Sequence, residues 1–382
     1  MFTLPASGQG LYTLGELNGS TAHEAFARGM SRDGKVVAGQ GDSANGTEDA
    51  FRWTPTGGIS SIGDLPGGDY YSSAFGISPE GTIIVGESVS TGSGLFAERV
   101  AFLYSTAGMI TFMYEIGDLP GGINESFAVA ASINGEVVVG QGNSANGPEA
   151  FRWSNIGGLT PMGDLPGGVF QSVAVDVSDN GTVIIGRGST DAGTELWRWT
   201  QATGMVGYGD LAGGDTFCNA FALSGDGSTA VGLGSTATGH QAFRWTVTSG
   251  FEALGDLPGG SELSAAFDVT SDGSIIVGRA TDAVGARAFI WDEVNGMRMI
   301  EDLLIAKGVD IGGWLLESAT GISQNGRYVI GQGMLDGNFM SWYADLGAPA
   351  KGPACPGDLN GDNIANLEDL QLLLFNFGAS CP

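Results

Sequence analysis

A triplet of Gly, an acidic residue and Leu returns along most of the chain at a nearly constant interval. The acidic residue of each copy stands at Glu16, Asp64, Asp118, Asp164, Asp210, Asp256 and Asp302, where the last copy has Glu in place of Gly. Subtracting neighbouring positions gives spacings of 48, 54, 46, 46, 46 and 46 residues. A fixed period of this length indicates a fold of stacked repeats, each of which buries its apolar face against the next.

Two further elements recur in phase with the triplet. The first is a turn of the form Ser-x-Asp/Asn/Glu-Gly followed by an apolar run that ends in Gly, as in "SDNGTVIIG" from Ser178. The second is a Phe-x-Trp pattern, as in "AFRW" at Ala50–Trp53, whose Trp or Tyr positions are Trp53, Tyr104, Trp153, Trp199, Trp245, Trp291 and Trp342. Asp-Gly or Asn-Gly between apolar segments is typical of a β-hairpin.

All three elements are interpreted as strands, which gives about four short strands per unit. The β-branched runs have the length of buried strands, and residues two apart on a strand share one face. The abundance of Gly, at 67 residues, fits many tight turns. Seven such units predict an all-β fold, a seven-bladed β-propeller over residues 1–346.

The residue between the two aromatic positions varies. It is Arg52, Arg152, Arg198 and Arg244 in four copies, and we assign Leu103, Ile290 and Met340 to the others. A position that accepts both Arg and aliphatic residues is expected to be partly buried, with the Arg stem packed and its head paired with an acid. Contact with a ligand is the alternative.

The two ends of the propeller are complementary. The first strand, Leu11–Leu17, has no aromatic strand before it, and the last aromatic strand, Phe339–Tyr343, has no complete strand after it. We expect the N-terminal strand to complete the last blade, either within one chain or between chains. Within the last unit, Leu303–Ala306 is expected to form a short helix that stops at Gly308.

The repeated acids allow two interpretations. One is a ring of cation sites around the propeller. The other is a structural turn, in which each Asp accepts backbone N–H groups of the following Pro-Gly-Gly segment.

Net charge excludes several partners. The chain has 42 acidic and 15 basic residues, for a formal net charge of −27, and such a surface repels nucleic acid and anionic membranes. The chain has no apolar run long enough for membrane insertion, and Met1–Gly10 lacks the pattern of a secretory signal. Only His23 and His240 are present, with no nucleophile motif, zinc pattern or phosphate loop, so we expect no enzymatic activity.

Together, "AFRW", "GDLPGG" and the Ser-x-Asp-Gly strand resemble the HAF repeat of bacterial extracellular and surface proteins. The resemblance extends roughly from Leu11 to Leu346, although Asp49, Glu149 and Gln241 replace the His of the motif. It implies a repetitive β-fold and export, and it implies no particular biochemical activity.

The composition changes after the last repeat. Residues 347–357 are rich in Pro, Gly and Ala and are predicted to be a linker. Residues 358–382 contain oxygen ligands at the spacing of an EF-hand loop: Asp358, Asn360, Asp362, Ile364, Asn366 and Asp369. This segment resembles a single dockerin-type calcium repeat, with Asn363 in place of the usual Gly and a helix at Leu367–Phe377. Calcium is the predicted cofactor.

Cys355 and Cys381 bracket the calcium segment, which is too small to bury a core of its own. We predict a disulfide between them, worth about 3 kcal/mol, and therefore an extracellular or cell-surface location. Cys218 is expected to be a free, buried residue in a strand.

Two classes of function fit these features. The first is an extracellular structural protein that self-associates, or anchors to a surface protein partner, through its termini and the calcium segment. The alternative is a recognition module that binds a glycan or a protein on a propeller face.

Overall fold

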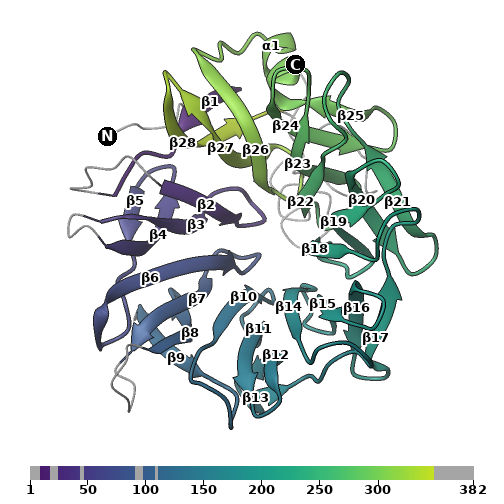
Figure 1. The fold of residues 1–382 in the computed structure, drawn as a ribbon. Coiled ribbons are helices and arrows are strands. Elements are labelled where there is room, and N and C mark those ends of the chain that lie inside the picture. The colour runs from purple at the N-terminus through teal and green to yellow at the C-terminus, as the bar shows by residue number, and fades with distance from the viewer. Residues whose placement is uncertain (1–8, 18–24, 44–46, 91–97, 108–110, 348–382) are drawn as a thin grey trace, which may run out of the picture.

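The computed structural model describes residues 9–17, 25–43, 47–90, 98–107 and 111–347. They form seven four-stranded antiparallel sheets, which are arranged as blades around a central channel (Figure 1). The prediction of a seven-bladed, almost entirely β propeller is confirmed. The innermost strands of the blades are β2, β6, β10, β14, β18, β22 and β26.

Each of blades 1 to 6 contains four consecutive strands, from the channel outward. Blade 1 consists of β2 (Ala25–Met30), β3 (Val37–Asp42), β4 (Glu48–Thr54) and β5 (Gly58–Ser61). Blade 2 consists of β6 (Gly67–Ile77), β7 (Ile83–Ser90), β8 (Glu98–Ser105) and β9 (Phe112–Gly117). Blade 3 consists of β10 (Phe127–Ala131), β11 (Val137–Ser144), β12 (Gly147–Ser154) and β13 (Gly158–Pro161). Blade 4 consists of β14 (Ser172–Val177), β15 (Val183–Ser189), β16 (Thr194–Thr200) and β17 (Gly204–Gly209). Blade 5 consists of β18 (Cys218–Leu223), β19 (Thr229–Ser235), β20 (His240–Thr246) and β21 (Gly250–Gly255). Blade 6 consists of β22 (Ala265–Val269), β23 (Ile275–Thr281), β24 (Ala286–Asp292) and β25 (Gly296–Met299).

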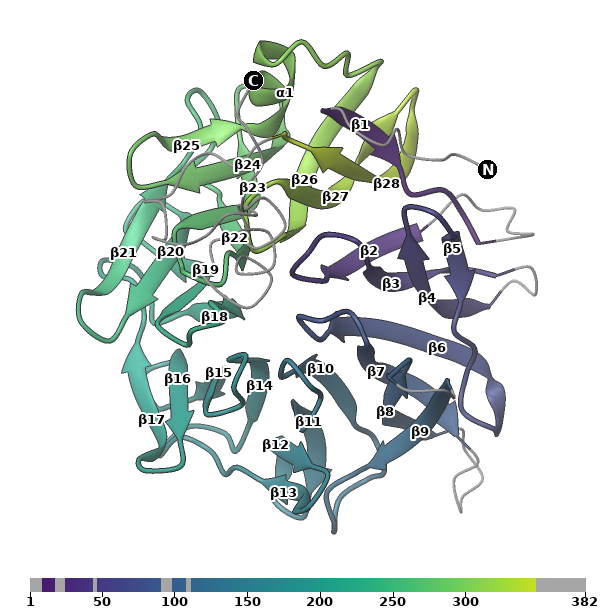
Figure 2. The same ribbon diagram turned by 180° about the vertical axis from the view of Figure 1, so that it is seen from behind.

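Blade 7 joins the two ends of the chain. It consists of β26 (Trp314–Ile322), β27 (Tyr328–Leu335), β28 (Asn338–Asp345) and, as its outermost strand, β1 (Gly10–Thr13) (Figure 2). β1 pairs with β28 antiparallel in a register that places Gly10 opposite Asp345. The predicted completion of the last blade is confirmed, and the ring closes within one chain.

One helix occurs among the described residues. It is α1 (Ile300–Ala306), which follows blade 6 and buries Ile300 and Leu304. Gly308 lies just beyond it with φ of 78°, and the N–H of Val309 bonds to the carbonyl of Leu304. These contacts form the expected glycine stop.

Every innermost strand has a β-bulge at the same place, where its pairing with the second strand shifts by one residue. The Gly that ends each apolar run stands opposite this bulge. A Cβ on Gly140 would lie 2.0 Å from the carbonyl oxygen of Phe127 and 2.9 Å from the ring of Phe151. The recurrent Gly is therefore required because the bulged strand and an aromatic ring both approach its backbone closely.

The aromatic pairs fill the space between neighbouring blades. Phe51 is fully buried and Trp53 nearly so, and the Trp53 ring lies 5.0 Å from that of Tyr343 in blade 7. This contact confirms the packing role predicted for the Phe-x-Trp pattern.

The alignment of the last repeat is corrected by its strand register. Trp342 lies opposite Gly331, as Phe151 lies opposite Gly140, so it occupies the Phe position and not the Trp position. By the same register, Tyr343 and not Met340 is the counterpart of the variable Arg. The prediction failed because "SWYA" offers two aromatic residues, and only pairing with β27 selects between them.

The Gly–acid–Leu triplet is not a strand, which corrects a second prediction. Its Gly ends the outermost strand or follows it, and the acid and Leu belong to the loop that crosses to the next blade. Gly63, Gly117, Gly163, Gly209 and Gly255 have φ between 80° and 92°, which lies outside the β region. The Leu of each of the first six triplets is buried, whereas Leu303 of the seventh copy is partly buried and lies in α1.

Candidate functional site

The channel has two different ends. Each innermost strand begins near the loop that arrives from the preceding blade and ends at a Ser-x-Asp/Asn/Glu-Gly turn. We call the first end the wide mouth and the second the narrow end. The bulge turns one side chain per blade toward the channel: Arg28, Phe75, Val129, Val175, Phe221, Phe267 and Thr320.

The wide mouth contains a cavity of about 660 Å³. Two parts of its wall are aromatic: Phe75 of blade 2 packs edge to face on Phe127 of blade 3, and Phe221 of blade 5 does the same on Phe267 of blade 6. The ring centroids of these pairs are 6.0 Å and 5.3 Å apart. The four rings are half-buried, so their remaining surface faces the cavity.

The polar part of the wall spans blades 6, 7 and 1 and lies between these two aromatic pairs. It is lined by Arg279, Glu317, Ser318, Thr320, Gln332 and Arg28. Blade 7 contributes four of these residues because β26 has a second register shift, between Leu316 and Ser318, which places Glu317 at a bulge. Glu87 also lines the cavity, and it pairs with Arg99 at 3.0 Å and accepts a hydrogen bond from the Tyr71 hydroxyl at 2.9 Å.

The narrow end is closed by side chains and backbone. Arg32 of blade 1 forms an ion pair with Asp179 of blade 4, and Ser271 of blade 6 donates to the same carboxylate at 3.1 Å. Neighbouring turns also bond through their backbones: the N–H of Asp179 reaches the carbonyl of Gly225 at 2.9 Å, and that of Gln324 reaches Arg32 at 2.9 Å. These contacts link the turns of several blades and stabilise the closed ring at this end.

Above this closure lies the inner chamber, a cavity of about 200 Å³ whose wall includes Asp176 and Asp268. Both carboxylates are half-buried and bond across to the next blade, where Oδ2 of Asp176 accepts the N–H of Leu223 at 2.7 Å. The surrounding blades desolvate the carboxylates, and this raises the pKa of each to about 7. Each carboxylate also accepts two backbone hydrogen bonds, which lower its pKa, but the effect of desolvation is larger. The charge on Asp268 raises the pKa of Asp176 further.

The triplet acids bind backbone groups. Oδ2 of Asp118, Asp164, Asp210 and Asp256 accepts the N–H seven residues later in the interblade loop, at 2.6 to 2.8 Å. Oδ1 of Asp118 also accepts the N–H of Asn143 in the next blade, at 2.9 Å. Among the described residues there is no group of three or more acidic, His or Cys side chains that could hold a metal ion. The contacts favour the structural interpretation, although the N–H groups that donate to Oδ2 lie further along the loop than the Pro-Gly-Gly segment.

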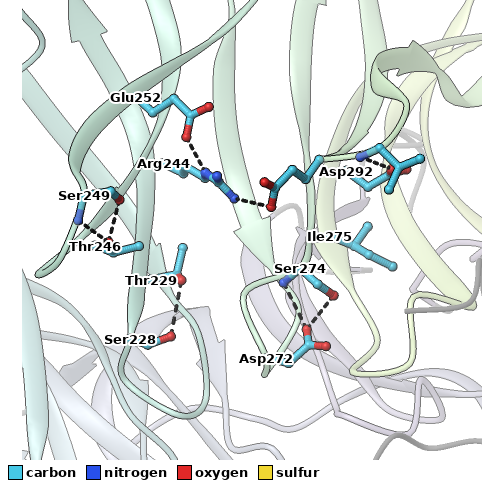
Figure 3. Close-up of polar contacts among 12 residues, drawn as sticks. Ser228, Thr229, Arg244, Thr246, Ser249, Glu252, Asp272, Ser274, Ile275 and Asp292 are labelled. Atoms are coloured by element: carbon cyan, nitrogen blue, oxygen red, sulfur yellow. Dashed lines mark hydrogen bonds and ion pairs between the residues drawn. The ribbon is translucent and has the colours of Figure 1, made fainter. Parts of the chain in front are cut away.

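The variable Arg is partly buried, as expected, and in one blade it pairs with acids. Arg244 forms an ion pair with Glu252 at 2.6 Å (Figure 3). It also pairs with Glu293 of the next blade at 3.6 Å and lies 5.0 Å from the Trp291 ring. In Arg52, Arg152 and Arg198 the buried Nε has no hydrogen-bond partner. None of the four lines either cavity.

Several predicted residues lie outside the described residues. These are the calcium ligands Asp358, Asn360, Asp362, Ile364, Asn366 and Asp369, the proposed disulfide pair Cys355 and Cys381, and His23. Cys218 is fully buried in β18 and forms no disulfide, as predicted, and burial raises the pKa of its thiol. His240 is exposed.

Sequence reasoning did not identify the residues of the wide mouth. The signal that could have found them is their place in the repeat. Counting back three residues from each Ser or Thr that opens the turn gives the bulge residue of every blade. Within the described part of the chain, no helix is long and apolar enough to cross a membrane.

No family model matches the chain, and no curated protein matches its sequence. Solved structures do match its fold. Oligogalacturonate lyase from Vibrio parahaemolyticus has 12% identity and a TM-score of 0.57, with 91% of this chain and 96% of that chain covered. The propeller domain of the Trilobed protease from Pyrococcus furiosus, reported to have an open velcro topology, has 8% identity and a TM-score of 0.53, with 87% and 98% covered.

A puromycin hydrolase also matches, with 12% identity and a TM-score of 0.51; the match covers 89% of this chain and 56% of the hydrolase. The presence of enzymes among these propellers overturns the prediction that the chain is not an enzyme. That prediction relied on local motifs, whereas a propeller brings residues of separate repeats to one channel. At such identities the fold alone is shared, and the chain is similar in architecture to propellers that include enzymes.

Proposed function

We propose that the protein binds a ligand in the wide mouth of its channel. The observation that carries this proposal is the cavity of about 660 Å³, whose wall has two pairs of half-buried Phe rings and a polar stretch between the pairs. Its volume falls within the usual range for small-molecule sites, and an apolar wall with a few polar groups is their usual composition. Binding is the step that recognition and catalysis have in common.

Variation within the repeat supports this proposal. Positions that build the blades keep one residue type, such as the Gly opposite each bulge, whereas the bulge position holds Arg, Phe, Val or Thr. Packing of the repeat therefore does not determine the bulge residue. Apolar rings that face an open cavity leave apolar surface in contact with water, which is unfavourable. A bound ligand that covers the rings would remove this surface from water and so gain binding free energy.

The experiment fills the mouth without disturbing the blades. Thr320→Phe and Val129→Phe introduce the residue that three other blades already have at this position, so both variants should fold. Thr320→Phe also removes a hydrogen bond to the Ala27 carbonyl, so circular dichroism should compare its fold with that of Val129→Phe. Ligand-observed NMR with a panel of sugars and aromatic fragments should detect compounds that bind the wild type and not the filled variants. Val247→Ser, at an exposed turn far from the channel, is the control and should bind normally. The proposal is wrong if no compound binds the wild type, or if every bound compound also binds both filled variants.

The C-terminal residues support a second proposal, on the sequence alone. We propose that the chain is a HAF-repeat extracellular protein whose residues 358–382 form a dockerin-like calcium segment stapled by a Cys355–Cys381 disulfide. Because ring closure within one chain needs no second molecule, this segment would be the part that self-associates or docks on a surface protein.

Deletion of residues 353–382 tests the assembly role. The propeller should fold, because every described strand precedes the deletion. Light scattering at high protein concentration with calcium should show self-association of the full chain and not of the deletion variant. Mass spectrometry of the full chain without reductant should find Cys355 and Cys381 joined. Equal sizes would remove the assembly role, and two free thiols would remove the disulfide.

A further inference from the structure

We infer that the ligand of the wide mouth is a carboxylate with a ring-bearing body, and that Arg28 and Arg279 hold its carboxylate. The inference rests on the proposed function and adds the chemical class of the ligand. Arg28 is the bulge residue of β2 in blade 1, and Arg279 follows the recurrent Gly of β23 in blade 6. Blade 7 lies between these blades, so the two side chains lie on either side of the blade 7 residues that line the cavity.

The two arginines are available to a ligand. Both side chains are exposed, and Arg279 has no hydrogen bond or ion pair to another described residue. Arg28 has one weak contact, from Nε to Oε1 of Gln40 at 3.3 Å. Six other arginines of the described chain are ion-paired: Arg32, Arg99, Arg244, Arg287, Arg298 and Arg327. Arg52, Arg152, Arg187 and Arg198 also form no ion pair with a described residue, but none of them lines the wide mouth.

The charge of the cavity favours an anion. Glu87 pairs with Arg99, so the charged groups of the wall that form no ion pair with a described residue are Arg28, Arg279 and Glu317. Arg28 also attracts Glu48, which does not line the cavity, and this leaves Arg279 as the wall cation with no described acid acting on it. Concave walls of low polarity strengthen the local field of such a cation, so an anionic ligand would be drawn into the cavity.

The position of Arg28 is supported by blade 7. The carbonyl of Ala27, directly before it, accepts a hydrogen bond from Thr320 Oγ1 at 2.9 Å and from Gln332 Nε2 at 2.8 Å. Ser318 donates to Oε1 of the same Gln332 at 3.2 Å. These bonds fix the backbone at the bulge, so the Arg28 side chain starts from a rigid base.

The rest of the cavity specifies the body of the ligand. The planar guanidinium fork matches a planar carboxylate with two parallel hydrogen bonds. Beside Arg279, which lies in the same blade as Phe267, the exposed faces of Phe221 and Phe267 can pack against a flat apolar surface. Either the apolar face of a sugar ring or an aromatic ring meets this requirement, so an acidic sugar and an aromatic acid share the relevant chemistry.

Calorimetry with matched probes tests the inference. Trigalacturonate and maltotriose compare acidic and neutral sugars of three rings, while 3-phenylpropionate and 3-phenylpropanol compare acidic and neutral aromatic compounds. At least one carboxylate should bind, and its neutral counterpart should bind about tenfold more weakly or not at all. Arg28→Gln and Arg279→Gln should each weaken the carboxylate by about tenfold, and added salt should weaken it in the wild type. Arg52→Gln, in a strand that does not line the cavity, is the control.

The outcomes separate this inference from the proposed function. The inference would be overturned if neutral probes bind as tightly as the carboxylates, or if the affinity for carboxylates is unchanged by both Arg substitutions. Either result would leave the proposed binding site standing. Phenyl phosphate that binds more tightly than 3-phenylpropionate would assign the arginines to a phosphate instead. Failure of every probe to bind, together with a negative screen of the filled variants, would overturn both.

Discussion

Oδ2 of Asp268 in blade 6 accepts a hydrogen bond from the backbone N–H of Ile322 in blade 7, at 2.7 Å. Asp176 has the same relationship with Leu223, one blade on from its own. The equivalent residue is Gly29, Gly76, Ala130, Ala222 or Gly321 in the other blades, so these two carboxylates are specific additions to the inner chamber.

Replacement of Asp268 by Asn should change how stability depends on pH. Burial raises the pKa of the folded carboxyl to about 7, whereas in the unfolded chain its pKa has the ordinary value of 3.8. Between these values the folded state binds more protons, so Asp268 makes the wild type progressively less stable as pH rises. The free energy of unfolding of the wild type minus that of Asp268→Asn should therefore fall from pH 4 to pH 7, with a slope of up to about 1.4 kcal/mol per pH unit.

Urea unfolding across this pH range checks the prediction, since all other acids are common to both proteins. Asp215→Asn, at an exposed position, should give a curve parallel to the wild type. A parallel curve for Asp268→Asn would mean that the pKa of Asp268 is not raised.

Gly140→Ala should destabilise the propeller by about 3 kcal/mol, because its Cβ would overlap the carbonyl oxygen of Phe127. Gly163→Ala is the matched control. Gly163 has φ of 84°, and a Cβ added there would meet no atom within 4 Å, so only the left-handed backbone opposes substitution, at about 1 to 2 kcal/mol. Chemical denaturation of both variants measures the difference, and equal losses would contradict a steric role for the recurrent Gly.

The Arg32–Asp179 pair should contribute measurable coupling across the narrow end. The side chains are 20% and 24% exposed, so solvent screens them only in part. A double-mutant cycle with Arg32→Met and Asp179→Asn should give a coupling free energy of about 1 kcal/mol that decreases in high salt. Additive effects of the two substitutions would show that the pair does not brace the ring.

Arg244→Leu should change the free energy of unfolding by no more than about 1 kcal/mol, even though Arg244 forms two ion pairs. The reason is that blade 2 has Leu103 at the same register position. Trp245→Leu, one residue later and 2% exposed, should cost about 3 kcal/mol because it empties packed space between blades. Thermal denaturation of the two variants should therefore rank them clearly, and a larger loss for Arg244→Leu would assign that residue a role beyond packing.

Calcium should bind the C-terminal loop with one ion per chain. Asp358→Ala should abolish the heat of calcium binding, because the substitution removes the first carboxylate of the loop. Asp215→Ala, in the propeller, should leave it unchanged. Titration calorimetry of the three proteins decides the matter, and uptake that is equal in all of them would exclude Asp358 as a ligand.

The repeat alone predicted the number of blades and about four short strands in each, but it placed the Gly–acid–Leu triplet in a strand where the structure has none. Hairpins form between neighbouring segments, so their signals, such as Asp-Gly turns and β-branched runs, are local and can be read along the chain. Complementary incomplete ends at Leu11–Leu17 and Phe339–Tyr343 also predicted how the ring closes. The choice of Trp342 for the Phe position, by contrast, depended on which of two local matches pairs with Gly331.

The candidate site was decided by tertiary structure. Arg28 and Arg279 are separated by most of the propeller in sequence, and they flank one blade only because the ring closes between blades 7 and 1. Likewise, no local pattern shows that the third residue before each turn bulges into the channel, because a bulge is a property of the pairing between two strands. The period specifies what the blades share, whereas the cavity is lined by the residues in which they differ and exists only when all seven are brought around one axis.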